Sequence, residues 1–278
     1  SQLLAVRGTA KPWPRSDAPQ PMSPEKRDRD RTGELWARFA DPSQIPAGES
    51  FAKILLPVER ITPEIIETLG DRLIGVLPAI LWPADEEAFE GRLAALKDAG
   101  LREVYGDNIY AIPLTRRLGL TLHGGAGLNI LNTEALRHYE EEGLSSVTAS
   151  FELSMRGIKA LGGSVPLGAI VYGRLPLMHF RNCPIRAQIG CAVCRAQGEL
   201  TDRRGVKFPV ECGEKKYSTL LNSVPLHIAD KDLRGLDHLI LWFTRESAAE
   251  CAAVAADYRA GKKSERERTG GLYYRELL

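Results

Sequence analysis

The sequence lacks the features that would assign it to a membrane or to a familiar class of hydrolase. No apolar run approaches the roughly 20 residues that cross a bilayer, and no cleavable signal opens the chain. Neither HExxH nor GxSxG occurs, so the motifs give no support to a standard metalloprotease or serine hydrolase. The formal net charge is only +1, which provides no overall attraction to nucleic acid or lipid. We therefore expect a cytoplasmic protein without a membrane partner.

An initiating methionine is also missing, since the chain begins at Ser1 and its first methionine is Met22. We therefore expect a piece of a longer protein, with other domains of that protein as partners. Residues 1–33 are rich in proline and end in a charged run, a composition typical of an extended linker.

Cysteine is scarce, yet four of the five cysteines lie in "RNCPIRAQIGCAVCRAQGELTDRRGVKFPVEC" (181–212). Five thiols cannot all pair, and a cytoplasmic cysteine cluster more often binds metal than forms disulfides. The spacing predicts four ligands for an iron–sulfur cluster or for zinc, namely Cys183, Cys191, Cys194 and Cys212. Free thiols and a redox dithiol are the alternatives. We expect Cys251 to be a core or surface residue, although it is also considered as a ligand.

The same segment is strongly basic. Nearby cations stabilise thiolates, and they are also candidate contacts for the phosphates of RNA. The arginines in question are Arg181, Arg186, Arg195, Arg203 and Arg204. An ordinary solvated surface is the alternative interpretation of these charges.

From residue 34 onward, apolar runs alternate with amphipathic stretches. Nearly continuous apolar strands between helices are typical of a parallel sheet that is buried on both faces. Eight such units over about 245 residues predict an α/β protein, a TIM-like (β/α)8 barrel over 34–278, with a cysteine-rich insertion at 174–232 between strands 7 and 8. A doubly wound open sheet is the second possibility. Helix starts are predicted at Thr62, which precedes Pro63, and at Asp85.

Polar residues that follow the predicted strands are candidate catalytic groups, because barrel active sites form at the carboxyl ends of strands. These are Asn108, His123 and Glu152. His123 opens the turn "HGGAG", whose backbone N–H groups are suited to contact an anion. A structural role is the alternative for His123 and for Glu152.

Several segments resemble the U32 peptidase (collagenase-like protease) family. They are "YGRLPLMHFRNCP", the C-x-x-C, "LTDRRGVKFPVEC", "YSTLLNSVPLHIAD", "GDNIYAIPLTRRLGLTLHGGAGLNILNTEAL" and the terminal "TGGLYYR". The four clustered cysteines match those of long, multi-domain members that are similar to a ribosomal-RNA cytidine hydroxylation protein. The resemblance implies a [4Fe–4S] cluster and oxygen-independent hydroxylation of an RNA base, with prephenate as the oxygen source.

Three functions follow from these observations. The first is an iron–sulfur-dependent RNA hydroxylase that acts on RNA, including ribosomal RNA. The second is a collagenase-like peptidase with a metal site and a peptide substrate. The third is a non-catalytic module in which zinc staples a loop and the barrel binds RNA or protein.

Overall fold

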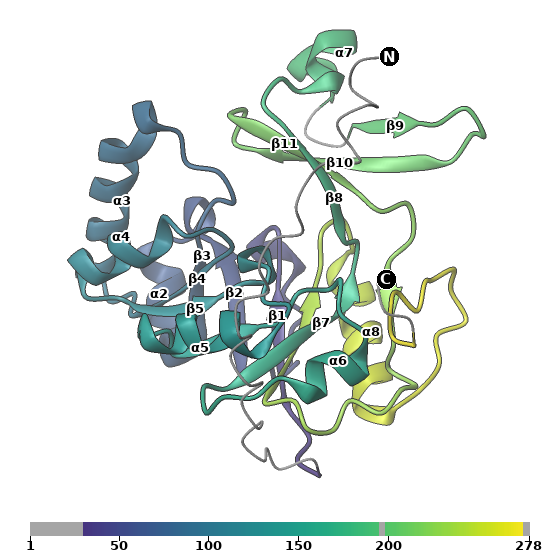
Figure 1. Cartoon of the computed structure of the whole chain (residues 1–278). Coiled ribbons are helices and arrows are strands. Elements are labelled where there is room, and N and C mark those ends of the chain that lie inside the picture. Colours follow the sequence, from purple (N-terminus) through teal and green to yellow (C-terminus); the bar gives the residue numbers. More distant parts are fainter. Residues whose placement is uncertain (1–29, 195–197, 275–278) are drawn as a thin grey trace, which may run out of the picture.

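The centre of the molecule is a closed ring of eight parallel strands (Figure 1). This computed structural model describes residues 30–194 and 198–274, so residues 1–29 of the predicted linker lie outside the described chain. Neighbouring strands pair in chain order, and β13 closes the ring by pairing with both β7 and β1. Closure confirms the predicted (β/α)8 barrel and excludes an open sheet. The strands are β1 (Glu34–Arg38), β2 (Lys53–Pro57), β3 (Leu73–Val76), β4 (Glu103–Gly106), β5 (Thr121–Gly124), β6 (Ser146–Thr148), β7 (Leu167–Gly173) and β13 (His238–Trp242).

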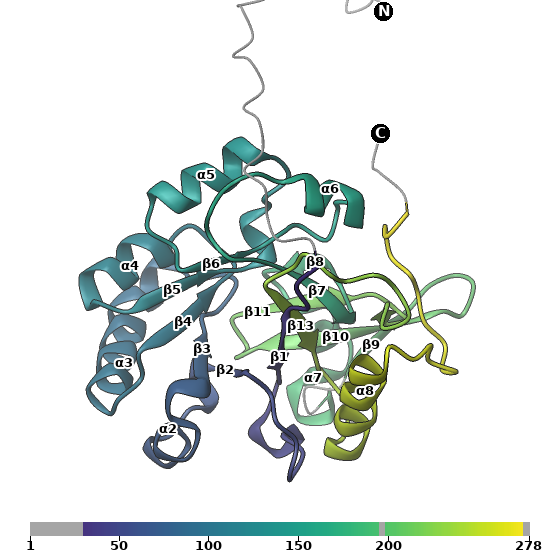
Figure 2. The ribbon, with the colours of Figure 1, turned by 90° about the horizontal axis from the view of Figure 1, so that it is seen from below.

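Six helices surround the ring (Figure 2). They are α2 (Pro63–Leu69), α3 (Glu86–Asp98), α4 (Ala111–Leu118), α5 (Thr133–Glu141), α6 (Met155–Ala160) and α8 (Ala248–Ala260). The Thr62 side chain accepts a hydrogen bond from the amide of Ile65, which confirms the predicted cap of α2. The predicted helix start at Asp85 is confirmed, because Asp85 occupies the N-cap position of α3, but its side chain makes no capping bond and pairs instead with Lys216 at 2.7 Å.

Short 3₁₀ turns complete several connections between strands and helices. β1 is followed by η2 (Pro42–Gln44) and by no α-helix before β2. The others are η3 (Val58–Arg60), η4 (Gly70–Arg72), η5 (Pro83–Asp85) and η6 (Ala126–Leu128). Among the described helices, none combines the length and the apolar character needed to cross a membrane.

The barrel interior is unusually polar for a fold whose centre is normally filled by branched apolar side chains. His238, which is 1% exposed, stacks on Trp36 with the ring centroids 4.1 Å apart. A Cβ atom on Gly168 would lie 2.2 Å from the His238 ring, so only glycine leaves room for the imidazole. Burial, and secondarily the nearby His123, lower the pKa of His238 to about 3.

A second sheet lies between β7 and β13 in the sequence and stands over one end of the ring (Figure 1). Its four antiparallel strands are arranged in the order β8-β11-β10-β9. They are β8 (Pro176–Phe180), β9 (Glu199–Thr201), β10 (Lys207–Gly213) and β11 (Tyr217–Leu221), with α7 (Pro184–Cys194) following β8. The next strand, β12 (Leu226–His227), returns to the barrel and pairs antiparallel with β7.

Candidate functional site at the barrel mouth

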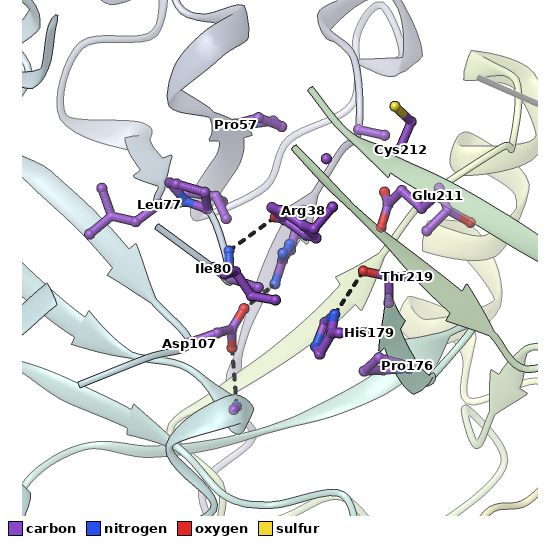
Figure 3. A pocket seen from close by; sticks show the side chains of 18 of the residues that line it. Arg38, Pro57, Leu77, Ile80, Asp107, Pro176, His179, Glu211, Cys212 and Thr219 are labelled. Carbon is purple, nitrogen blue, oxygen red and sulfur yellow. Dashed lines mark hydrogen bonds and ion pairs between the residues drawn. The ribbon is translucent and has the colours of Figure 1, made fainter. Parts of the chain in front are cut away.

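A cavity of about 1520 Å³ separates the second sheet from the carboxyl ends of the barrel strands (Figure 3). We call it the mouth cavity. The barrel side contributes residues at or after strand ends, including Arg38, Asp107, Asn108, Glu152 and Trp242. The second sheet contributes His179, Glu211, Cys212, Tyr217 and Thr219. Active sites of barrel enzymes form at this end of the fold, and the cavity is therefore the candidate site.

Arg38 and Asp107 form an ion pair on the barrel side of the cavity. Nη1 of Arg38 lies 3.0 Å from Oδ2 of Asp107, and the two side chains are only 15% and 14% exposed. The guanidinium also lies over the Trp242 ring, 4.0 Å from its centroid. Burial alone would lower the pKa of Arg38, but Asp107 and other nearby acidic groups reverse the effect and raise it. Arg38 is thus a charged group whose orientation is fixed by two partners.

The turn "HGGAG" holds the Asp107 carboxylate in place. The amide of Gly127 donates a hydrogen bond of 3.2 Å to Oδ1 of Asp107. A Cβ atom on Gly125 would lie 2.0 Å from the same oxygen, and one on Gly127 would lie 2.4 Å from the Asp107 carbonyl oxygen. The glycines therefore allow the backbone to approach Asp107 closely. The anion that this turn contacts is a side chain of the protein itself.

The sheet side of the cavity carries two groups that are biased toward their neutral forms. Burial raises the pKa of the Glu211 carboxyl, although Arg38 and Arg245 oppose this shift. Burial lowers the pKa of His179, whose Nδ1 lies 2.9 Å from the Thr219 hydroxyl. In Figure 3, Glu211 on β10 and His179 on β8 extend toward Arg38 from the second sheet, in which β11 separates the two strands. The cavity therefore combines one fixed cation with a carboxyl group whose pKa is raised and an imidazole whose pKa is lowered.

Two of the three predicted catalytic residues line the mouth cavity. Asn108 follows β4, and its Nδ2 donates a hydrogen bond of 3.0 Å to the carbonyl oxygen of Ala79. Glu152 follows β6 and is exposed in the cavity wall. Their positions agree with the expectation that polar residues after strands gather at the mouth, while their catalytic roles stay predictions.

His123 occupies a different position. Its Nδ1 lies 2.8 Å from the Ser146 hydroxyl, and its Nε2 lies 3.1 Å from Glu103, the first residue of β4. Lys53, the first residue of β2, pairs with the same carboxylate at 2.7 Å. His123 therefore lies inside the barrel, toward the amino ends of the strands, and is absent from the described lining of the mouth cavity. His123 lies within β5, one residue before the strand ends, and its side chain is on the face of the strand that points into the barrel.

The hydrogen-bonded Ser146, His123 and Glu103 have the residue types of a hydrolase triad. However, Ser146 is 3% exposed, and it too is absent from the described lining of the mouth cavity. A nucleophile must reach its substrate. This set therefore satisfies buried polar atoms within the barrel and does not form an accessible catalytic site.

The four clustered cysteines all belong to the segment that carries the second sheet. Cys183 precedes α7, Cys191 and Cys194 lie in its last turn after a kink at Gly190, and Cys212 is on β10. Burial, and to a smaller extent the charges of Cys183 and Cys191, raise the pKa of Cys212. Burial opposes ionisation of Cys183, but hydrogen bonds from the Arg186 amide and the Ser218 hydroxyl bring its pKa below the usual value. Three of the thiols are thus close enough to affect one another electrostatically.

The four thiols are the donor set of an iron–sulfur cluster or of a zinc ion. In the described part of the chain, no group of three or more His, Cys, Asp or Glu side chains is placed to hold a metal ion. Cys251 lies apart, in the core on α8, where burial raises the pKa of its thiol to about 12. The metal assignment for the four clustered thiols stays a prediction.

The predicted RNA-contacting arginines occupy several parts of the second sheet. Arg181 lies over the Trp82 ring, 4.6 Å from its centroid, and Arg186 is exposed on α7. Arg203 and Arg204 are exposed in the turn between β9 and β10, whereas Arg195 lies outside the described residues. Arg38, His179, Glu211 and Arg245 were not among the predicted site residues. The only available indication was that a charged residue interrupts or ends an apolar run at Arg38 and Glu211.

Comparisons with known proteins identify the family of this chain. The solved structure of the U32 peptidase Mk0906 is similar to this chain, with 15% sequence identity and a TM-score of 0.49. The similar region covers 81% of this chain and 98% of the Mk0906 chain. No curated protein matches the chain. The family model described as peptidase family U32 matches residues 64–233, which is more than half of the chain. The chain belongs to peptidase family U32.

Proposed function

We propose that this chain is the barrel of a larger enzyme that hydroxylates an RNA base without molecular oxygen. In this proposal a [4Fe–4S] cluster is held by Cys183, Cys191, Cys194 and Cys212, and the base binds in the mouth cavity. The observation that carries the proposal is the position of Cys212. It lines the same cavity as Arg38 and Asp107, so a cluster on these cysteines would adjoin the substrate.

Four cysteines are the usual ligand set of a [4Fe–4S] cluster, whose geometry differs from that of a zinc site. One tetrahedral zinc ion, with Zn–S bonds of about 2.3 Å, needs its thiolates within about 4 Å of one another. In a [4Fe–4S] cluster each cysteine binds a different iron, so the sulfur atoms lie farther apart. The charges of Cys183 and Cys191 raise the pKa of Cys212, which supports a shared site for these thiols, and metal analysis distinguishes the two arrangements.

The side chains of the cavity supply binding and proton transfer. A bound cluster would supply single-electron transfer. Arg38, fixed by Asp107 and Trp242, offers its remaining N–H groups to acceptor atoms of a bound base. Burial raises the pKa of Glu211, which favours a role as proton donor, and burial lowers the pKa of His179, which favours a role as proton acceptor. A base in folded RNA must be unstacked to enter such a cavity.

Anaerobic purification followed by metal and sulfide analysis tests the proposal. We expect a brown protein with about four iron and four sulfide per chain. Cys212→Ser should lose the colour and the iron, whereas the matched control Cys251→Ser should keep both, because Cys251 lies in the core away from the cluster. One zinc per chain, with no iron or sulfide in protein kept from oxygen, would reject the proposal and favour the zinc-stapled binding module.

A peptidase is the second candidate because the chain belongs to peptidase family U32, and the buried, hydrogen-bonded Ser146, His123 and Glu103 can be tested directly for a nucleophile. A serine-directed phosphonate should leave the native protein unlabelled, since the Ser146 hydroxyl is buried. Labelling that disappears in Ser146→Ala would establish the peptidase and overturn this assignment.

A further inference from the structure

The second sheet is packed as a unit separate from the barrel. Its buried apolar side chains include Ile185, Val210 and Leu221. In the described chain these three do not belong to the continuous apolar cluster that fills the barrel. The mouth cavity lies between the two units, so much of the space between them is open and not packed. We call strands β8 to β11, together with α7, the lid.

Two groups of polar contacts, which we call clasps, hold the lid against the barrel, and the exposed Arg60–Glu214 ion pair of 3.4 Å adds a further contact. The first clasp is Arg245, which follows β13. Its Nη2 donates hydrogen bonds of 2.6 Å to the Gly198 carbonyl and 3.3 Å to the Val210 carbonyl, and its Nη1 lies 3.4 Å from Glu199. The Arg245 side chain therefore connects the barrel to β9, to the residue before β9, and to β10.

The second clasp is the loop after β3. The Ala79 amide donates a hydrogen bond of 3.1 Å to the Tyr217 hydroxyl, and Nε1 of Trp82 donates one of 3.3 Å to the Lys216 carbonyl. The exposed Lys216–Asp85 ion pair and the Arg181 guanidinium over the Trp82 ring complete it. The ring order places β3 three strands away from β13, so the two clasps grip different sides of the lid.

The chain enters and leaves the lid at one place. Arg174, after β7, donates to the carbonyl of Asn222 at 3.1 Å and to that of Ser223. The Asn222 amide in turn donates to the Leu175 carbonyl at 2.9 Å. The two connections are thus tied together beside β7, which gives the lid a single attachment point and leaves its other sides held by the clasps.

We infer that the lid opens about this attachment to admit the substrate and that its closure assembles the site. Closure brings His179, Glu211 and Cys212 opposite Arg38 and Asp107, so neither unit alone contains the complete cavity. The clasps suit a reversible contact because they are hydrogen bonds, two ion pairs and one cation–ring contact, and among the described residues the buried apolar side chains of the lid lie outside the barrel's apolar cluster. This inference does not depend on which reaction the cavity carries out.

Tryptophan residues provide reporters at the required places. With 5-fluorotryptophan incorporated, fluorine NMR shows Trp82 at the second clasp, Trp242 in the barrel wall of the cavity and Trp36 in the barrel core. Arg245→Ala breaks the first clasp, and its effect is measured at the fluorine signal of Trp82. Asp85→Asn weakens the second clasp, and its effect is measured at the fluorine signal of Trp242. A response at the other clasp requires the lid to move as one body.

We expect Arg245→Ala to raise the open population by roughly tenfold to a hundredfold, given the strength of hydrogen bonds from a charged donor. The Trp82 signal should shift or broaden while the Trp36 signal stays unchanged. Asp85→Asn, which keeps the side chain's shape, should give a smaller change at Trp242. Arg234→Ala is the matched control, because Arg234 pairs with Asp30 and Asp232, outside the lid.

Three outcomes would overturn the inference. The first is no change at Trp82 in Arg245→Ala together with no change at Trp242 in Asp85→Asn. The second is a change confined in each variant to the clasp that was altered. The third is an equal change in Arg234→Ala or at Trp36, which would show general loosening of the fold. None of these depends on a bound cluster or on activity, so the inference can fail while the proposed function stands.

Discussion

Replacing Asp107 should destabilise the protein because it leaves the Arg38 guanidinium buried without its carboxylate. The two charged groups are 3.0 Å apart, and an effective dielectric constant of about 20 gives an attraction of about 5 kcal/mol at that distance. The cost of burying both charges offsets part of this energy. We therefore expect Asp107→Asn to lower the free energy of unfolding by about 2–3 kcal/mol. Asp107→Ala should lower it by about 3–5 kcal/mol, because the Gly127 amide also loses its acceptor.

A double-mutant cycle with Arg38→Met isolates the coupling, since the double variant contains no unpaired charge. Urea unfolding should show the double variant to be more stable than the summed single effects predict, by about 1–3 kcal/mol. The exposed pair Arg234 and Asp232 provides the control cycle, in which we expect no measurable coupling. Additive effects at Arg38 and Asp107, or equal coupling in the two cycles, would refute the argument that the ion pair is a buried, fixed element of the cavity.

Three further predictions concern residues outside the cavity. Ser146→Ala should cost about 1–3 kcal/mol in urea unfolding, because His123 loses a buried partner, and an equally stable variant would contradict this. Cys251 should react with a thiol reagent only after unfolding, whereas the exposed Cys191 of the metal-free protein reacts in the native state. His238 stays neutral in the folded protein down to a pH of about 3 but gains a proton near pH 6.5 in the unfolded chain. Stability should therefore fall as pH decreases through this window, by up to about 1.4 kcal/mol per pH unit; a matching slope in His238→Phe would show that His238 is not the cause.

The barrel was predictable because its strands are buried on both faces. Such strands are nearly continuous apolar runs, and glycines or helix caps separate them from the amphipathic helices. The strands of the lid were not predicted. They are short and mix apolar with charged residues, as in "KFPVECG" of β10, because one face meets solvent or the cavity. The segment was therefore described by its cysteines and not by its secondary structure.

The pattern of a strand shows roughly where it ends but not which way its last side chains point. His123 was expected at the mouth because a glycine turn follows it, yet it is the third residue of β5 and faces the barrel interior. Arg38 is the last residue of β1 and does reach the mouth, but it lies within the run "ELWARF". A shift of one or two residues along a strand separates the two outcomes, which is smaller than the accuracy of predicted boundaries.

The glycine turn shows what the pairing of strands β4 and β5 reveals that the sequence alone does not. Spacing alone indicated a close approach of the backbone to an anion but gave no identity for that anion. The parallel register pairs Gly106 with Gly124, so the next residues, Asp107 and Gly125, are neighbours across the ladder. A carboxylate at 107 then leaves no room for a side chain at 125. The Gly127 amide of the turn is already bound to Asp107, so it is not free to bind a ligand in the cavity. Such a ligand instead contacts Arg38, whose orientation is fixed by Asp107.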